Sequence, residues 1–235
     1  MSAATTVWRN DLRNVVRDRT IGILLAVPLG FLAMLRFGYP IAERQLSLDP
    51  SYRADVLAVF CLISATFPAF VTAFIMLDEK DAGLIAVLRV LPVSPALLLG
   101  YRLLVVAVFS AFYPLILIGF TGLSARPLPE VLVLGLLCAL GSPAATLLVV
   151  ATAANKIVGL AMFKGLFFLL GFTIVCAVFP GWWTVVAAVV PTFWIASTFG
   201  ATSTSGFFVN AAVAVVFHLL VIVLAYRRFR RQITT

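Results

Sequence analysis

The feature that most constrains this chain is residues 165–226, a run that contains no Asp, Glu, Lys or Arg. Over all 235 residues, 63% are hydrophobic and 11% are charged, whereas a soluble domain has about 25% charged residues. A helix needs about 20 mostly apolar residues to cross a bilayer. The sequence therefore predicts an all-α integral membrane protein with a single transmembrane domain over residues 1–235.

Six segments have the length and composition of membrane spans: Thr20–Tyr39, Asp55–Leu77, Leu97–Leu123, Glu130–Ala154, Ile157–Pro180 and Phe207–Tyr226. The uncharged run would accommodate one span more, but the arginines argue against it. They gather near both ends of the chain, at Arg9, Arg13, Arg17 and Arg19 and at Arg227, Arg228, Arg230 and Arg231. Because basic residues favour the cytoplasmic side, both termini are expected there, and the number of spans must be even.

The segment left over, residues 181–200, is rich in aromatic residues and is divided by Pro191. We predict two short helices that enter the outer leaflet and return, forming a re-entrant hairpin before the last span. Broken backbone cannot face lipid, so such a hairpin must be buried against protein. The alternative is an interfacial loop in which Trp182, Trp183 and Trp194 lie at the membrane surface.

The net charge of +8 follows the predicted topology. With six spans, 13 of the 17 Lys and Arg fall on the cytoplasmic side. The excess of basic residues therefore indicates how the chain is oriented in the membrane, and no nucleic-acid partner is expected. The three cysteines, Cys61, Cys138 and Cys176, lie within apolar runs and are expected to be buried. Their spacing fits neither a metal site nor a disulfide framework.

The N-terminal arm, residues 1–19, has the pattern of an amphipathic helix. Its apolar positions share helical spacing at Trp8, Leu12, Val15 and Val16, and an adjacent stripe carries Arg9, Arg13 and Arg17. Such a helix lies in the plane of the membrane with its arginines near anionic headgroups. This helix either anchors the chain at the membrane surface or transmits the movement of a cytoplasmic partner to the first span.

The connection after the second span, residues 78–94, differs from an ordinary loop. It opens with Asp78, Glu79, Lys80 and Asp81, and Gly83 then permits a sharp change of direction. Leu84, Val87, Leu88 and Leu91 follow at helical spacing on one face, and Pro92 ends the helix because the residue before a proline disfavours helical geometry. The pattern predicts a cytoplasmic helix on which another protein docks; the alternative is a solvated loop between spans.

The chain has no evident energy source of its own. It lacks the glycine-rich phosphate loop of ATPases, since residues 159–165 do not end in Gly-Lys-Ser or Gly-Lys-Thr. Carriers coupled to protons or sodium ions place carboxylates inside the membrane, but all nine acids here lie at span ends or in loops. A separate ATPase docked on the cytoplasmic loop is therefore expected to supply the energy.

The run from Glu79 through Gly83-Leu84, Leu88, Leu91-Pro92-Val93-Ser94, Leu98 and Gly100 resembles the region after the second span in type-two ABC exporter permeases. Members of that family have six spans, an N-terminal connecting helix, a coupling helix and re-entrant helices before the last span. This sequence departs from the family pattern at Leu84, Ala86 and Tyr101-Arg102. In size it is also similar to drug-export permeases of high-GC bacteria, including fluoroquinolone exporters.

The resemblance implies a transport subunit of the bacterial plasma membrane that catalyses no reaction. ATP and magnesium would bind an ABC ATPase partner, with no cofactor or metal in this chain, and a second permease chain, identical or paralogous, would complete the path. The implied substrate is amphipathic or hydrophobic, such as a drug, a lipid-like molecule or a glycoconjugate. An autonomous secondary carrier or channel is the alternative, and a lone histidine without paired acids argues against an embedded enzyme.

Five residues are candidates for the substrate path: Lys164, Phe168, Phe172, Trp194 and His218. Lys164 either extends toward the cytoplasmic interface or lines a cavity there. His218 is either a neutral helix contact or part of a proton relay. The polar residues Ser142, Thr146, Thr152 and Asn155 are expected to support helix packing rather than ligand binding.

Overall fold

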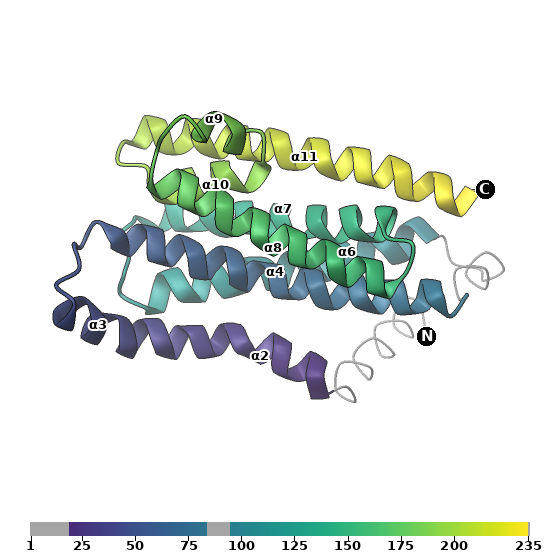
Figure 1. Ribbon diagram of the computed structural model, residues 1–235, viewed down its shortest axis with the longest axis horizontal. Helices are drawn as coiled ribbons and strands as arrows, with labels where there is room; N and C mark the ends of the chain where they lie inside the picture. Colours follow the sequence, from purple (N-terminus) through teal and green to yellow (C-terminus); the bar gives the residue numbers. More distant parts are fainter. Residues whose placement is uncertain (1–18, 84–94, 235) are drawn as a thin grey trace.

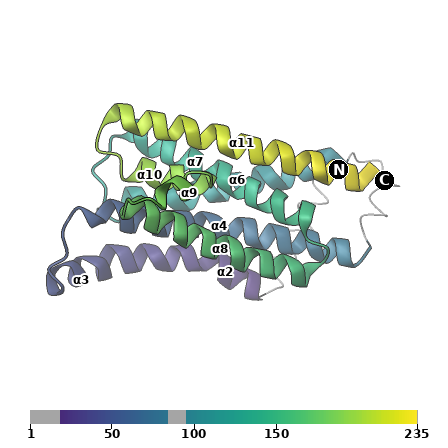
Figure 2. The same cartoon turned by 45° about the horizontal axis from the view of Figure 1, so that its top comes forward.

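A computed structural model describes residues 19–83 and 95–234, and every regular element in this part of the chain is a helix (Figure 1). In order, the elements are α2 (Arg19–Ala33), the π-helical turn η1 (Met34–Gly38), α3 (Tyr39–Gln45), α4 (Tyr52–Asp81), α6 (Pro95–Phe120), α7 (Leu128–Thr152), α8 (Lys156–Val178), α9 (Thr184–Ala187), α10 (Pro191–Phe199) and α11 (Thr204–Thr234). The long helices run side by side along one axis in both views (Figures 1 and 2).

The prediction of six membrane-spanning helices is confirmed. Six stretches are long and apolar enough to cross a membrane: Leu25–Gln45, Tyr52–Asp81, Leu97–Phe120, Leu128–Thr152, Lys156–Val178 and Thr204–Arg231. They follow the predicted order, and most of their ends differ from the predicted ends by a few residues. The last helix continues beyond Tyr226 through the tail arginines, which therefore lie on a helix. The chain is a multi-pass membrane protein.

The two ends of the bundle differ in charge. The end where α4 stops, α6 starts and α11 stops carries Lys80, Arg102, Lys156 and the α11 arginines, and we call it the basic end (Figure 1). The other end, which we call the opposite end, holds the connections between α3 and α4 and between α6 and α7, together with α9 and α10. α2 also begins toward the basic end, on the side where α11 ends (Figure 1).

Helix boundaries follow from glycine and proline. α10 begins at Pro191, because proline is favoured at the first helical position, and α6 is described from Pro95 onward. α4 is followed by Gly83 with a φ of 71°, and α6 by Gly122 with a φ of 77°. Glycine adopts these left-handed values without steric cost, so both helices end where the chain must turn.

The helices α4 and α7 form the centre of the bundle, and the remaining spans surround them. Within their most apolar windows, 56% of α4 residues and 61% of α7 residues are buried, against 17% in the first span. One buried apolar cluster lies toward the opposite end and includes Leu57, Leu134 and Phe207. A second lies toward the basic end and includes Leu77 and Phe163. The three cysteines are buried and unpaired, as predicted.

α4 contains a proline near its middle, and two neighbouring helices supply hydrogen bonds beside it. Pro68 has no N–H and its ring crowds the carbonyl four residues earlier, so the turn that precedes it loses a backbone hydrogen bond. The Ala65 carbonyl accepts hydrogen bonds from Ser110 Oγ of α6, at 2.9 Å, and from Ser142 Oγ of α7. Hydroxyls from adjacent helices compensate backbone disruption inside a membrane in this way. Three helices therefore meet at one carbonyl oxygen.

The same arrangement recurs in the first span. Pro28 interrupts α2, and the carbonyl three residues before it, that of Leu25, accepts a hydrogen bond of 2.8 Å from Tyr113 Oη of α6. The other polar residues expected to serve packing also bond to the backbone. Thr146 Oγ1 donates to Ser142 O at 3.0 Å, and Asn155 Oδ1 accepts from Val158 N–H at 2.9 Å at the start of α8.

A close helix crossing explains one glycine of α8. A Cβ atom added at Gly159 would lie 2.2 Å from Leu77 Cδ1 of α4 and 3.6 Å from Val149 Cγ1 of α7. At Gly165, two turns further along the same helix, an added Cβ would meet no atom within 4 Å. Small residues let membrane helices approach closely, so Gly159 permits the contact between α4 and α8.

Residues 181–200 form two short helices, α9 and α10, that are broken at Pro191 as predicted. They cover α8 through a small apolar cluster of Cys176, Ala187 and Phe193. Trp194 Nε1 donates to Ala188 O at 2.8 Å, and Thr173 Oγ1 lies 3.1 Å from Thr192 Oγ1. The broken backbone is thus packed on protein. How deeply this segment enters the membrane stays a prediction, as does the interfacial alternative.

Candidate functional site

The connection between α4 and α6 is closed at its base by an ion pair. Glu79 lies in the last turn of α4, and Arg102 lies near the start of α6. Arg102 Nη1 is 2.5 Å from Glu79 Oε2, and Nη2 is 2.6 Å from Oε1, so the pair is bidentate. The side chain of Arg102 is 6% exposed and that of Glu79 is 23% exposed. Charged hydrogen bonds sheltered in this way are stronger than exposed ones and fix the geometry of both partners.

A second set of contacts joins the end of α4 to the start of α8. Lys156 Nζ lies 2.7 Å from Asp78 Oδ2, and the Lys156 backbone N–H donates to Asp81 Oδ2 at 2.9 Å. The Lys156 ammonium also lies 5.4 Å from the centre of the Phe74 ring. Both charged side chains of the Lys156–Asp78 pair are about half exposed, so the ion pair itself adds about 0–1 kcal/mol of stability.

The end of α7 is held by two cations from other helices. Lys80 Nζ of α4 donates to Ala153 O at 2.8 Å, and Arg228 Nε of α11 donates to Ala151 O at 3.0 Å. Carbonyls at a helix C-terminus have no partner within the helix, and cations there are favoured by the helix dipole. The charged residues at the end of α4 therefore contact α6, α8 and the end of α7 directly. The last helix, α11, contacts the end of α7 beside them.

The structure brings three of the predicted coupling residues together at this base: Asp78, Glu79 and Gly83. The other residues predicted for coupling and for the interfacial helix lie outside the described residues: Leu84, Leu88, Leu91, Pro92, Trp8, Arg9, Arg13 and Arg17. The Glu79–Arg102 ion pair joins the end of α4 to the start of α6 beside this connection. The two predicted helices themselves stay predictions.

Sequence reasoning gave no structural partner to Arg102, Lys156 or Arg228. The sequence did show single charged residues at the ends of long apolar helices. A charged side chain at such a position must either bond to an oxygen atom of the protein or reach solvent. Glu79 and Arg102 also stand on either side of the same connection, so helices that run back on one another bring them close. Which oxygen each cation reaches depends on how the helices are rotated.

A pocket lies within the membrane part of the bundle, between α8 and α11. α7 and α4 form its floor, and the junction of α9 and α10 closes it toward the opposite end. Its volume is about 150 Å³, and its walls are almost entirely apolar. Among the five residues predicted for a substrate path, His218 lines this pocket. Its side chain is buried, at 2% exposed.

The other four predicted path residues lie elsewhere. Phe172 and Trp194 pack around the apolar cluster beneath α9 and α10. Lys164 and Phe168 are exposed on the outer face of α8, with Phe168 80% exposed. The structure therefore does not gather the five into one site within a single chain, and their contribution to a path stays a prediction.

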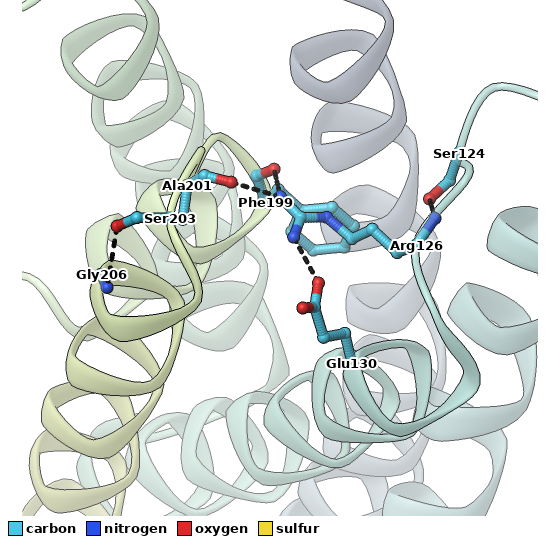
Figure 3. Close-up of polar contacts among 7 residues, drawn as sticks. All are labelled: Ser124, Arg126, Glu130, Phe199, Ala201, Ser203 and Gly206. Atoms are coloured by element: carbon cyan, nitrogen blue, oxygen red, sulfur yellow. Dashed lines mark hydrogen bonds and ion pairs between the residues drawn. The ribbon is translucent and has the colours of Figure 1, made fainter.

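Several elements at the opposite end are joined by Arg126, which lies in the connection between α6 and α7. Figure 3 shows its guanidinium directed at the end of α10 and at Glu130 of α7. Arg126 Nη1 lies 2.6 Å from Glu130 Oε2, and Nη2 donates to Phe199 O at 2.8 Å and to Ala201 O at 2.7 Å. It also lies 5.2 Å from the centre of the Phe207 ring of α11. One cation thus joins the starts of α7 and α11 to the end of α10.

Comparison with known proteins gives the family. Residues 11–226 match the family described as fluoroquinolones export permease protein Rv2686c-like. Two proteins, fluoroquinolones export permease protein MT2760 of Mycobacterium tuberculosis strain CDC 1551 / Oshkosh and Rv2686c of strain ATCC 25618 / H37Rv, are each 31% identical over 242 residues. The alignment covers 98% of this chain and 95% of either relative. No solved structure matches the chain.

These matches agree with the resemblance to type-two ABC exporter permeases seen in residues 79–100, and with six helices able to span a membrane. They extend over almost the whole chain, from the N-terminal arm to the end of the last predicted span. The chain therefore belongs to the Rv2686c-like family of fluoroquinolone export permeases and is a multi-pass membrane transport protein.

Proposed function

We propose that this chain is the membrane subunit of an ATP-binding-cassette exporter and that a separate ATPase drives it by docking on residues 78–94. The observation that carries the proposal is the Glu79–Arg102 ion pair, which joins the two helices on either side of that segment. A docked partner that moves the segment would move α4 and α6 as a pair. ATP and magnesium would bind the partner, which performs the hydrolysis.

The proposed orientation places the basic end in the cytoplasm, together with both termini. The basic end carries Lys80, Arg102, Lys156 and the α11 arginines, and such residues favour the cytoplasmic side. The protein would lie in the bacterial plasma membrane, with α9 and α10 toward the outside. A second permease chain, identical or paralogous, would complete the translocation path.

The proposed substrate is an amphipathic aromatic drug of the fluoroquinolone type. Both relatives are named as fluoroquinolones export permeases, and their identity of 31% extends along almost the full chain. The apolar and aromatic composition, with 20 Phe and 4 Trp and acids only at span ends or in loops, suits such a molecule better than a highly charged one. We propose export rather than uptake because both relatives are named as export permeases.

The experiment changes Leu84 and Leu88 together to aspartate, which should abolish docking because both lie on the predicted apolar face. Cells carrying Leu84→Asp/Leu88→Asp should accumulate a fluoroquinolone as cells without the protein do, although the protein is inserted in normal amounts. The ATPase should also no longer co-purify with it.

The matched control is Leu46→Asp/Leu48→Asp, which places the same charges in the loop between α3 and α4 at the opposite end. It should retain export and ATPase binding. Normal ATP-driven export by the Leu84/Leu88 variant would refute the coupling assignment. Export that survives loss of the ATPase but stops when an ionophore collapses the ion gradients would instead identify a secondary carrier.

A further inference from the structure

The pocket beside His218 has one polar atom that no neighbouring group satisfies. Its hydroxyl groups already have partners. Ser142 Oγ donates to Ala65 O, Thr66 Oγ1 donates to Leu62 O at 2.7 Å, and Thr192 Oγ1 pairs with Thr173 Oγ1. Apart from Cys138, the remaining wall is formed by aliphatic side chains of α4, α7, α8, α10 and α11 and by Val190. The imidazole of His218 is the exception.

The hydrogen bond of His218 fixes its tautomer. Nδ1 lies 2.7 Å from Ala214 O, one turn earlier in α11. A carbonyl oxygen only accepts, so Nδ1 carries the proton, and Nε2 of the neutral ring is left as an acceptor. Within residues 19–83 and 95–234, no group hydrogen-bonds to Nε2. The atom faces α7 at Gly141, where an added Cβ would lie 3.5 Å from it.

Gly141 lines the pocket next to Nε2. An added Cβ at this position would already contact Nε2, so a larger side chain there would compete with a ligand for the atom. A buried acceptor without a partner is unfavourable, and inside a membrane no bulk solvent supplies a donor. The geometry therefore favours an occupant with an apolar body and one O–H or N–H group.

We propose that this pocket binds a single ring-sized apolar group that carries one hydroxyl or N–H donor, and that His218 Nε2 accepts the hydrogen bond. A cavity of about 150 Å³ holds a benzene-sized molecule, so the volume suits one ring and excludes a whole polycyclic drug. The ligand enters from the membrane between α8 and α11. This site lies inside one chain and does not depend on the ATPase or on export.

The test uses the fact that the chain has one histidine. Protein labelled with ¹⁵N-histidine gives one Nδ1 and one Nε2 resonance, and no assignment is needed. Phenol and toluene, added to the protein in nanodiscs at equal mole fractions in the bilayer, have nearly the same size and differ in the donor. Phenol should shift Nε2 upfield and leave Nδ1 in place, whereas toluene should leave both unchanged.

The binding affinity provides a second readout. One hydrogen bond to a neutral acceptor should make phenol bind about fivefold tighter than toluene, and replacing His218 by leucine should remove that preference. Gly141→Leu should abolish the phenol-induced shift. Gly171→Leu is the matched control, because Gly171 is exposed on α8 with no atom within 4 Å of an added Cβ, and it should behave like the parent protein.

The proposal is overturned if saturating phenol leaves Nε2 unshifted, or if toluene shifts it equally. It is also overturned if Gly141→Leu binds phenol as the parent does. An unchanged Nδ1 resonance in Gly141→Leu shows that the bond to Ala214 persists and that loss of binding is not caused by unfolding of α11. Loss of drug export in the Leu84/Leu88 variant has no bearing on these outcomes.

Discussion

Replacing Glu79 by glutamine should loosen the base of the connection between α4 and α6. Glutamine has the same shape as glutamate and keeps one oxygen acceptor, but it removes the charge opposite Arg102. The Arg102 side chain is only 6% exposed, so water compensates little for that loss. A hydrogen bond to a charged group contributes about 1.5–3 kcal/mol and a neutral one about 1 kcal/mol, and a bidentate pair contains two. We expect a loss of about 2 kcal/mol, which corresponds to about a 30-fold increase in local opening.

Native-state hydrogen exchange measures this opening directly. Amides of the first turns of α6, around the buried Leu99, should exchange about 30-fold faster in Glu79→Gln than in the parent protein. Glu130→Gln is the matched control, since it makes the same change at the opposite end. It should leave the exchange rates of the α6 amides near Leu99 unchanged. Asp78→Asn removes the more exposed ion pair and should change exchange at most about fivefold. Equal rates in Glu79→Gln and Asp78→Asn would refute the reasoning.

Two further predictions concern helix packing. Ser110→Ala and Ser142→Ala should each cost about 0.5–1 kcal/mol, because the Ala65 carbonyl keeps the other serine, and the double variant should cost about 1 kcal/mol more than their sum. Denaturant unfolding in detergent checks this, and strict additivity would contradict the shared acceptor. Gly159→Ala should lower stability by about 1–3 kcal/mol through overpacking against α4, whereas Gly165→Ala should maintain it. Equal losses of stability in Gly159→Ala and Gly165→Ala would show that the close approach of α4 does not explain the glycine at position 159.

The sequence was sufficient to predict the number and order of the spans, because the length of an apolar run is a local property. It also located the break at Pro191 between α9 and α10, since a proline acts on its own turn. His218 bonds to the carbonyl one turn earlier in α11, and its role as a helix contact or in a proton relay stays a prediction. That its second nitrogen faces a pocket could not be predicted.

Several contacts that the sequence did not predict join distant elements. Arg126 reaches the carbonyl of Phe199, 73 positions away, and Lys80 reaches that of Ala153. Such pairings depend on the rotation and height of each helix, which apolar periodicity does not determine when helices are apolar on most faces. Carbonyl acceptors add to the difficulty, because every residue offers one and no residue type identifies it.

The carbonyl of Ala65 has a mechanical consequence. Ser110 and Ser142 hold α4 at this point from two sides, and the point lies near the middle of the helix. At 1.5 Å per residue, Glu79 lies about 21 Å from it in one direction and Tyr52 about 20 Å in the other. A rigid tilt of α4 about this point would therefore have arms of nearly equal length. Such a tilt would move the two ends in opposite directions by similar amounts, so an inward displacement of the basic end would accompany an outward displacement of the opposite end.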